Sequence, residues 1–241
     1  MNLYLAQLKS EVRLVLRNGE QLLLTIGIPV LLLVFFSMVD VLPTGTEDPV
    51  DFLAPGVLSL AVMSTAMVSL GISTGFERGY HVFKRLGLTP LGTPRLIAAK
   101  ISTVMIVEML QFAVLIPVAL ALGWNTSAGN WGLAVVAVIL GTAAMGGIGL
   151  TIAGRLRAEI NLAAQNGLYL LLLLASGMVF PLDELPLVMR GISRALPSTA
   201  LADLVREGLS NAGTRPGFSL AVLAAWAVAA PVVAAISFRW D

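Results

Sequence analysis

The stretch that decides the fold is residues 76–100, FERGYHVFKRLGLTPLGTPRLIAAK, because long apolar segments lie on both sides of it. This stretch carries five of the 15 Lys and Arg residues of the chain and its only His. A basic segment with Pro and Gly between two membrane spans is typical of a cytoplasmic loop. The sequence therefore predicts that residues 76–100 lie in water on the cytoplasmic side of a membrane.

The middle of this loop, from Tyr80 to Leu88, is expected to form roughly two helical turns. Thr89-Pro90 ends this helix, because the residue before a proline is disfavoured in the α region. Helical spacing divides the segment into one face with Tyr80, Phe83 and Gly87 and another with His81, Lys84, Arg85 and Leu88. A short amphipathic helix held between two spans is suited to docking into a groove of another protein.

The composition of the whole chain is that of an all-α integral membrane protein. Its 241 residues are 57% hydrophobic and 12% charged, and this charged fraction is about half that of an average globular protein. A helix needs roughly 20 apolar residues to cross a bilayer. Six segments meet this condition, at residues 22–39, 53–75, 101–122, 131–153, 162–181 and 217–238. We therefore predict a single transmembrane domain over residues 1–241.

The distribution of Lys and Arg predicts the orientation. Eleven lie before the first span, in 76–100, between the fourth and fifth spans, and after the sixth. The longest segment on the other side, 182–216, has four, and the 40–52 loop has none. Because basic residues concentrate on the cytoplasmic side, both termini are expected in the cytoplasm, in a multi-pass protein of the plasma (inner) membrane.

Two segments outside the spans have amphipathic patterns. In residues 1–21, Leu5, Leu8 and Val12 recur at helical spacing, which is typical of a helix lying in the membrane interface. In residues 182–216, prolines separate two short helical patterns, which predicts a re-entrant outer hairpin. Its second helix is expected to be capped by Ser198. One face of that helix has Leu201, Leu204, Val205 and Leu209.

Few residues of the chain are candidates for chemistry. There is no Cys, so thiolate metal sites and thiol nucleophiles are excluded. Lys9, Lys84 and Lys100 follow Leu, Phe and Ala, whereas a P-loop needs Gly before its Lys. We therefore predict no catalytic residue, no metal site, no nucleotide-binding motif of that type and no nucleic-acid partner in this chain.

Glu108 is the one acidic residue well inside a predicted span, and Gln111 lies on the same helical face. A carboxylate at membrane depth usually faces the bundle interior or an aqueous path. Two interpretations stay open for this pair. It forms a polar seam that fixes helix packing, which we favour, or it lines a cargo path.

Several of these motifs resemble the type-2 ABC transporter permease family. In the loop they are Glu77-Arg78, Phe83-Lys84-Arg85-Leu86, Thr89-Pro90 and, ten residues on, Lys100. Near the C-terminus they are SGMVFPLDELP (176–186) and ISRALPSTALADLVREGL (192–209). The loop departs from the usual pattern at Gly79, His81 and Lys84, where the family more often has Glu, Gly and Glu.

The resemblance implies the membrane subunit of an ABC exporter, similar to drug and lipid exporters, with an N-terminal elbow helix and a coupling helix between spans 2 and 3. ATP and Mg would be bound by a separate ATPase chain, so this chain is not itself an enzyme. A second permease copy or a related chain would complete the pore among membrane lipids. The residues expected to contact the ATPase are Glu77, Arg78, Tyr80, Phe83, Lys84, Arg85 and Leu86.

The apolar spans favour a hydrophobic or amphiphilic cargo, such as a drug, a lipid or a glycolipid. Two other functions were weighed. A secondary transporter tends to show repeat symmetry and several buried carboxylates, and we find no repeat and one such carboxylate. A membrane-embedded lipid enzyme needs clustered Asp, His or Ser at one depth, which the sequence lacks. The loop could also be a plain topological signal without a partner.

Overall fold

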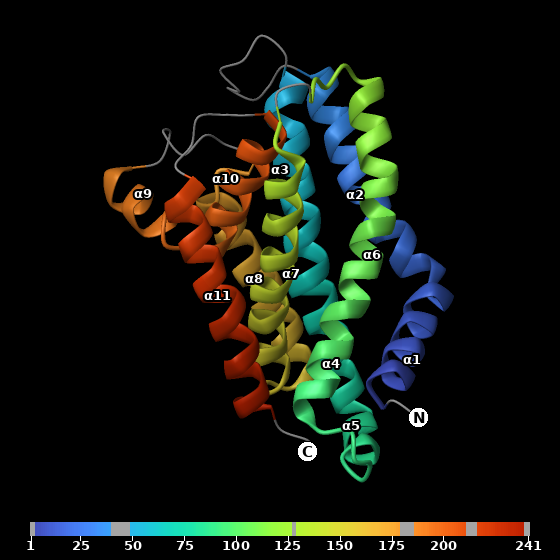
Figure 1. The fold of residues 1–241 in the computed structure, drawn as a ribbon. Coiled ribbons are helices and arrows are strands. Elements are labelled where there is room, and N and C mark those ends of the chain that lie inside the picture. The colour runs from blue at the N-terminus through green and yellow to red at the C-terminus, as the bar shows by residue number, and fades with distance from the viewer. Residues whose placement is uncertain (1–2, 40–48, 127–128, 179–185, 211–215, 239–241) are drawn as a thin grey trace.

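The fold is a bundle of long helices, as the computed structural model in Figure 1 shows. The structure describes residues 3–39, 49–126, 129–178, 186–210 and 216–238, and no strand occurs in these ranges. Six helices are long and apolar enough to cross a membrane. They are α2 (Gly19–Met38), the continuous helix Pro49–Gly79, α6 (Thr93–Ala121), α7 (Trp131–Ala153), α8 (Ala158–Ala175) and α11 (Pro216–Ser237). Each coincides with a predicted span, so the all-α membrane fold is confirmed.

Four shorter helices accompany the long ones: α1 (Leu3–Arg17), α5 (Val82–Leu86), α9 (Leu187–Ser193) and α10 (Pro197–Ser210). They fall in the segments where the sequence predicts the elbow, coupling and outer helices. Residues 182–185 and 211–215 of the predicted outer hairpin, and most of the 40–52 loop, lie outside the described residues. The places of these short helices relative to a membrane stay predictions.

The helix Pro49–Gly79 is at the centre of the bundle. It consists of α3 (Pro49–Met63), a π-helical segment η1 (Ser64–Ser69) and α4 (Leu70–Gly79). Its most apolar window is 83% buried, against 11% for the corresponding window of α2. The segments α3, η1 and α4 pack against α2, α6, α7, α8 and α10, so this helix connects the loop after Gly79 with the core.

Glycines allow the close approach of helices inside this chain. A Cβ on Gly147 of α7 would collide with the backbone of Ala230 and Pro231 in α11, and one on Gly71 would collide with the Gln165 side chain in α8. Small residues at such crossings let helix backbones approach closely. Gly71 and Gly147 therefore serve helix packing within this chain.

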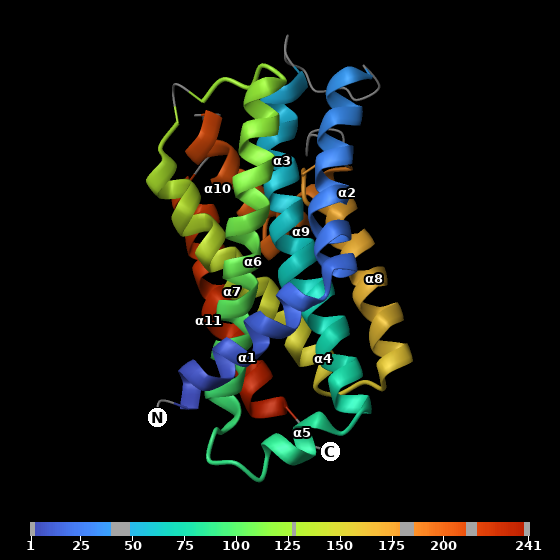
Figure 2. The same ribbon diagram turned by 90° about the vertical axis from the view of Figure 1, so that its right-hand side faces the viewer.

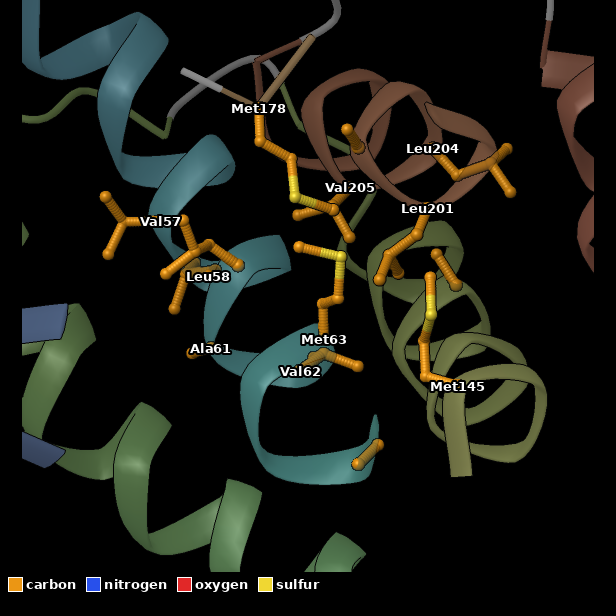
Figure 3. Close-up of a cluster of buried hydrophobic side chains, with 14 of the residues drawn as sticks. Val57, Leu58, Ala61, Val62, Met63, Met145, Met178, Leu201, Leu204 and Val205 are labelled. Atoms are coloured by element: carbon orange, nitrogen blue, oxygen red, sulfur yellow. The ribbon is translucent and has the colours of Figure 1, made fainter. Parts of the chain in front are cut away.

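Helix α10 is inserted among the long helices, against α3, α7 and α11 (Figures 1 and 3). The predicted apolar face is correct, because Leu201, Leu204, Val205 and Leu209 are all at most 3% exposed. The predicted cap is wrong. The helix begins at Pro197, a residue favoured at the first helical position because it needs no N–H partner there. The hydroxyl of Ser198 therefore lies inside the helix, without a hydrogen-bond partner among the described residues.

Helix α1 crosses obliquely over α6, at the same end of the bundle as α5 and the end of α11 (Figure 2). Some of its polar residues face the protein, whereas Lys9, Arg13 and Arg17 are exposed. Tyr4 Oη lies 2.8 Å from Ser102 Oγ of α6, and Glu11 is buried. Its apolar side faces outward, with Leu5 56% and Leu16 50% exposed. An apolar outer face is what a helix resting on a bilayer requires.

Candidate functional site

The loop between α4 and α6 is built around a break in the helix at His81. Helix α4 ends at Gly79, and His81 has a left-handed backbone with φ of 58°. Such a backbone is uncommon for a residue other than Gly, although His tolerates it better than most. The predicted helix of two turns is therefore wrong in length, because α5 spans only Val82–Leu86. The break at His81 also means that the side-chain directions in α5 do not continue the helical spacing of α4.

This break overturns the predicted faces of the loop. Tyr80 is 72% exposed and Phe83 is fully buried, so the two aromatic rings do not share a face. Phe83 packs edge-on against Phe238, with ring centroids 5.1 Å apart, beside Leu91 and Leu96. Phe83 thus holds α5 against the rest of the chain. It contacts residues at the beginning of α6 and just after the end of α11.

The outward surface of the loop is polar and basic. Tyr80, His81, Lys84 and Arg85 are exposed, and Leu88 is 90% exposed. We call Tyr80, Lys84 and Arg85 the α5 outer face. Of the predicted contact residues, these three point to solvent, Leu86 is half-buried, and the other three face the protein. The structure therefore exposes only part of the predicted set.

The two charged residues before the break face inward. Arg78 lies at the end of α4, and its Nη1 donates to the carbonyls of Ala153 and Leu156, each at 3.4 Å. These carbonyls belong to the last residue of α7 and to the connection between α7 and α8. Glu77 accepts a hydrogen bond from Lys100 at 2.7 Å. Arg78 and Glu77 thus attach the loop to both neighbouring parts of the bundle.

Lys100 is the centre of a buried ion cluster. Its Nζ lies 2.7 Å from Glu77 Oε2 and 3.2 Å from Glu11 Oε2, and 5.7 Å from the centre of the Phe83 ring. The Lys100 side chain is 1% exposed, against 10% for Glu11 and 26% for Glu77. We call Glu11, Glu77 and Lys100 the Lys100 cluster. It joins α1, α4 and α6, and Phe83 adds α5.

The energetics of this cluster depend on its being complete. Desolvation of three charges is expensive, and their mutual attraction offsets that cost only when the geometry is good. Gln7 supplies a further donor to Glu11 Oε1 at 2.8 Å, and the Phe83 ring adds a favourable cation–π contact. Loss of the single cation would leave two neighbouring carboxylates without compensation. The cluster therefore links the position of α5 to the position of α1.

A cavity of about 630 Å³ lies beside the cluster, between α1, α2, η1, α4 and α6. Glu11, Glu77 and Lys100 form part of its wall. Asn18, Gln21, Ser69 and Ser73 also line it, and Gln21 Nε2 donates to Ser69 Oγ at 2.7 Å. Apolar side chains such as Leu14, Leu22 and Phe76 also line it, so the lining is mixed. A movement of α1 against α4 would change the shape of this cavity.

Glu108 and Gln111 lie deep in the bundle and bond to different helices. Glu108 Oε2 accepts from Thr142 Oγ1 of α7 at 2.6 Å. Gln111 Oε1 accepts from Thr65 Oγ1 of η1 at 3.0 Å, and its Nε2 donates to the Thr25 carbonyl of α2 at 2.8 Å. Both side chains are at most 1% exposed. They form interhelical bonds of the kind expected for packing, Glu108 to α7 and Gln111 to η1 and α2.

Sequence reasoning missed two members of the Lys100 cluster. Glu11 was not singled out, and Lys100 was noted only for its spacing in the loop motif. A signal was available, because Glu11 is the one acidic residue in a helix that otherwise carries Lys9, Arg13 and Arg17. Within the described ranges, no group of three or more His, Cys, Asp or Glu is placed to hold a metal ion.

Six membrane-length helices with a basic loop fixed to their core define a multi-pass α-helical membrane protein. A model of the family described as "ABC-2 type transporter" matches residues 2–209. The curated "Putative transport permease YvfS" of Bacillus subtilis (strain 168) is 28% identical over 218 residues, which is 86% of this chain and 87% of that protein. The chain belongs to the ABC-2 type transporter family and is a membrane permease of that class.

Proposed function

We propose that this chain is the membrane-spanning subunit of an ABC exporter, and that a separate ATPase chain drives it through the α5 outer face. The family implies an ATPase partner. The observation that supports the contact surface is the position of α5. Its Phe83 is buried in the chain, and Lys84 and Arg85 are exposed. A rigidly held basic surface suits an acidic groove on a partner protein.

The Lys100 cluster supports a route for the coupling. ATP-driven movement of the partner would displace α5, and the contact of Phe83 with Lys100 would carry this displacement to Glu77 of α4 and Glu11 of α1. Helix α4 continues into the buried helix Pro49–Gly79. Movement at the cytoplasmic end would in this way reshape the cavity of about 630 Å³ beside the cluster and the path beyond it.

The proposed cargo is hydrophobic or amphiphilic, such as a drug, a lipid or a glycolipid. The membrane-length helices carry many exposed apolar side chains, on α2 and α8 among others. Such surfaces suit contact with lipid or with a second permease copy, and we propose a dimer because six spans leave little room for a large path. For Gln111 and for the Oε2 atom of Glu108 we favour the packing role, since each bonds a neighbouring helix.

Reconstitution tests the proposed function. The chain is purified with its ATPase partner and placed in lipid vesicles, and uptake of a fluorescent lipophilic dye is measured. We expect uptake to need both chains and ATP with Mg, and to stop when ATP is replaced by a non-hydrolysable analogue. Dye movement by this chain alone, driven by an ion gradient without ATP, would instead favour a secondary transporter.

The orientation can be tested separately by cysteine labelling, because the chain has no native Cys. Leu88 is exposed in the loop before α6, and Asn125 is exposed at the other end of that helix. With an impermeant maleimide added to intact cells, we expect Asn125→Cys to be labelled and Leu88→Cys to be protected until the cells are permeabilised. The reverse pattern would place α5 outside the cytoplasm and remove the basis for ATPase docking there.

A further inference from the structure

A second, apolar cavity lies on the side of the bundle between α6 and α7. Its volume is about 290 Å³. The inner wall is buried and includes Leu58 of α3 and Val205 of α10 (Figure 3). The rim is exposed, with Met109 69% and Val135 56% exposed. In a membrane-spanning protein, this rim faces the hydrocarbon region, so the cavity is open to molecules dissolved in the bilayer.

Among the described residues, Glu108 is the only carboxylate that lines this cavity. Glu108 is 1% exposed. Oε2 is bonded to Thr142, whereas Oε1 has no hydrogen-bond partner among the described residues. A buried carboxyl oxygen without a donor is costly, and more so in a membrane. The Oε1 atom thus lacks a donor in a cavity whose other side chains are apolar apart from the indole of Trp131.

We propose that this cavity binds a small hydrophobic amine taken from the bilayer. The ammonium group would donate to Glu108 Oε1, and the apolar body would pack against side chains such as Met105, Phe112 and Val138. A charged donor supplies both the missing hydrogen bond and the compensating charge. The volume is at the lower end of the roughly 300–1,000 Å³ of ligand pockets, so the ligand is a single-ring molecule or the equivalent.

The depth of Glu108 argues against a lipid headgroup as the source of the amine. Glu108 is seven residues after Ile101, where the predicted span begins, which is roughly 10 Å into the membrane along a helix that rises 1.5 Å per residue. Thr142 is close to the middle of α7. A headgroup amine stays at the membrane surface, whereas a lipophilic amine reaches this depth. The site does not depend on the proposed function, because its occupation needs no ATPase.

Trp131 lines the cavity, and its fluorescence provides the measurement. The purified chain in lipid nanodiscs is titrated with 4-bromobenzylamine, whose bromine quenches indole fluorescence, and with the neutral 4-bromobenzyl alcohol. The signal is the quenching that disappears in Trp131→Phe. We expect saturable quenching by the amine at concentrations about tenfold lower than by the alcohol, since a charge-assisted bond is worth more than a neutral one.

Three variants distinguish the site from general partitioning into lipid. Glu108→Gln removes the charge at similar size and should weaken amine binding about tenfold, with a smaller effect on the alcohol. Val138→Phe leaves Glu108 in place and fills the cavity, so it should weaken both probes. Glu159→Gln makes the same substitution at an exposed position of α8 and should leave both titrations unchanged.

Equal titrations of the amine and the alcohol in the wild-type chain would overturn the proposal. So would unchanged amine binding in both Glu108→Gln and Val138→Phe, or quenching that persists in Trp131→Phe. If Glu108→Gln does not yield folded protein, Val138→Phe decides the matter. Weaker binding of both probes to that variant supports the proposal that they bind in the cavity, and unchanged binding contradicts it.

Discussion

Replacement of Lys100 by Met is expected to reduce the folded yield of this protein severely. The methionine has similar length and no charge, so it leaves Glu11 and Glu77 buried next to each other without their common partner. Breaking a buried ion pair by removing one partner typically costs about 3–5 kcal/mol. We expect a comparable loss in the free energy of unfolding, measured by thermal or denaturant unfolding in detergent.

Two controls separate this effect from a general loss of positive charge. Lys9→Met makes the same substitution at an exposed position of α1 and should leave stability nearly unchanged, as surface charges contribute little. Adding Glu11→Gln and Glu77→Gln to Lys100→Met removes the unpaired carboxylates and should recover much of the loss. A Lys100→Met protein as stable as the wild type would show that the cluster does not hold α1, α4 and α6 together.

The spans could be predicted from the sequence because an apolar run of about 20 residues has one stable solution in a bilayer, a helix across it. Helix α7 begins and ends at the predicted residues, Trp131 and Ala153. The amphipathic pattern of α10 was also sufficient, since four apolar residues at helical spacing had to be buried together. In both cases the information is local, within one or two turns of the same helix.

The faces of the loop could not be predicted in this way. Periodicity assigns faces only while the helix is continuous, and the left-handed residue His81 resets the phase between Tyr80 and Phe83. The sequence has no Gly at that position to reveal the break. The phase is fixed instead by the tertiary contact of Phe83 with Phe238, which lies at the far end of the chain.

The Lys100 cluster was beyond sequence reasoning for a similar reason. Lys100 is 89 residues from Glu11 and 23 from Glu77, so no pattern in one helix connects them. The pattern of α1 was sufficient for its outward apolar residues, because a helix in the membrane interface turns its apolar face to the bilayer. It gave no sign of the inward side of that helix, where Glu11 pairs with Lys100.

The α5 outer face leads to the second large expected effect, an uncoupled transporter that is still folded. In the double variant Lys84→Glu and Arg85→Glu, both substituted side chains are exposed, so the thermal stability of the chain should change little. An Arg at the centre of an interface commonly contributes 2 kcal/mol or more. With the charge reversed, we therefore expect ATPase-driven transport to fall by at least about 30-fold, measured in vesicles with both chains present.

A matched control exists in the connection between α7 and α8, where Arg155 and Arg157 are also exposed. Arg155→Glu with Arg157→Glu changes the net charge by the same amount away from α5 and should lower transport much less. Phe83→Ala is a poorer test, because Phe83 is fully buried, and its loss would cost about 3–5 kcal/mol through cavity formation alone. Normal co-purification and normal transport in the Lys84 and Arg85 double variant would mean that the basic loop only orients the protein, and that the ATPase binds elsewhere on it.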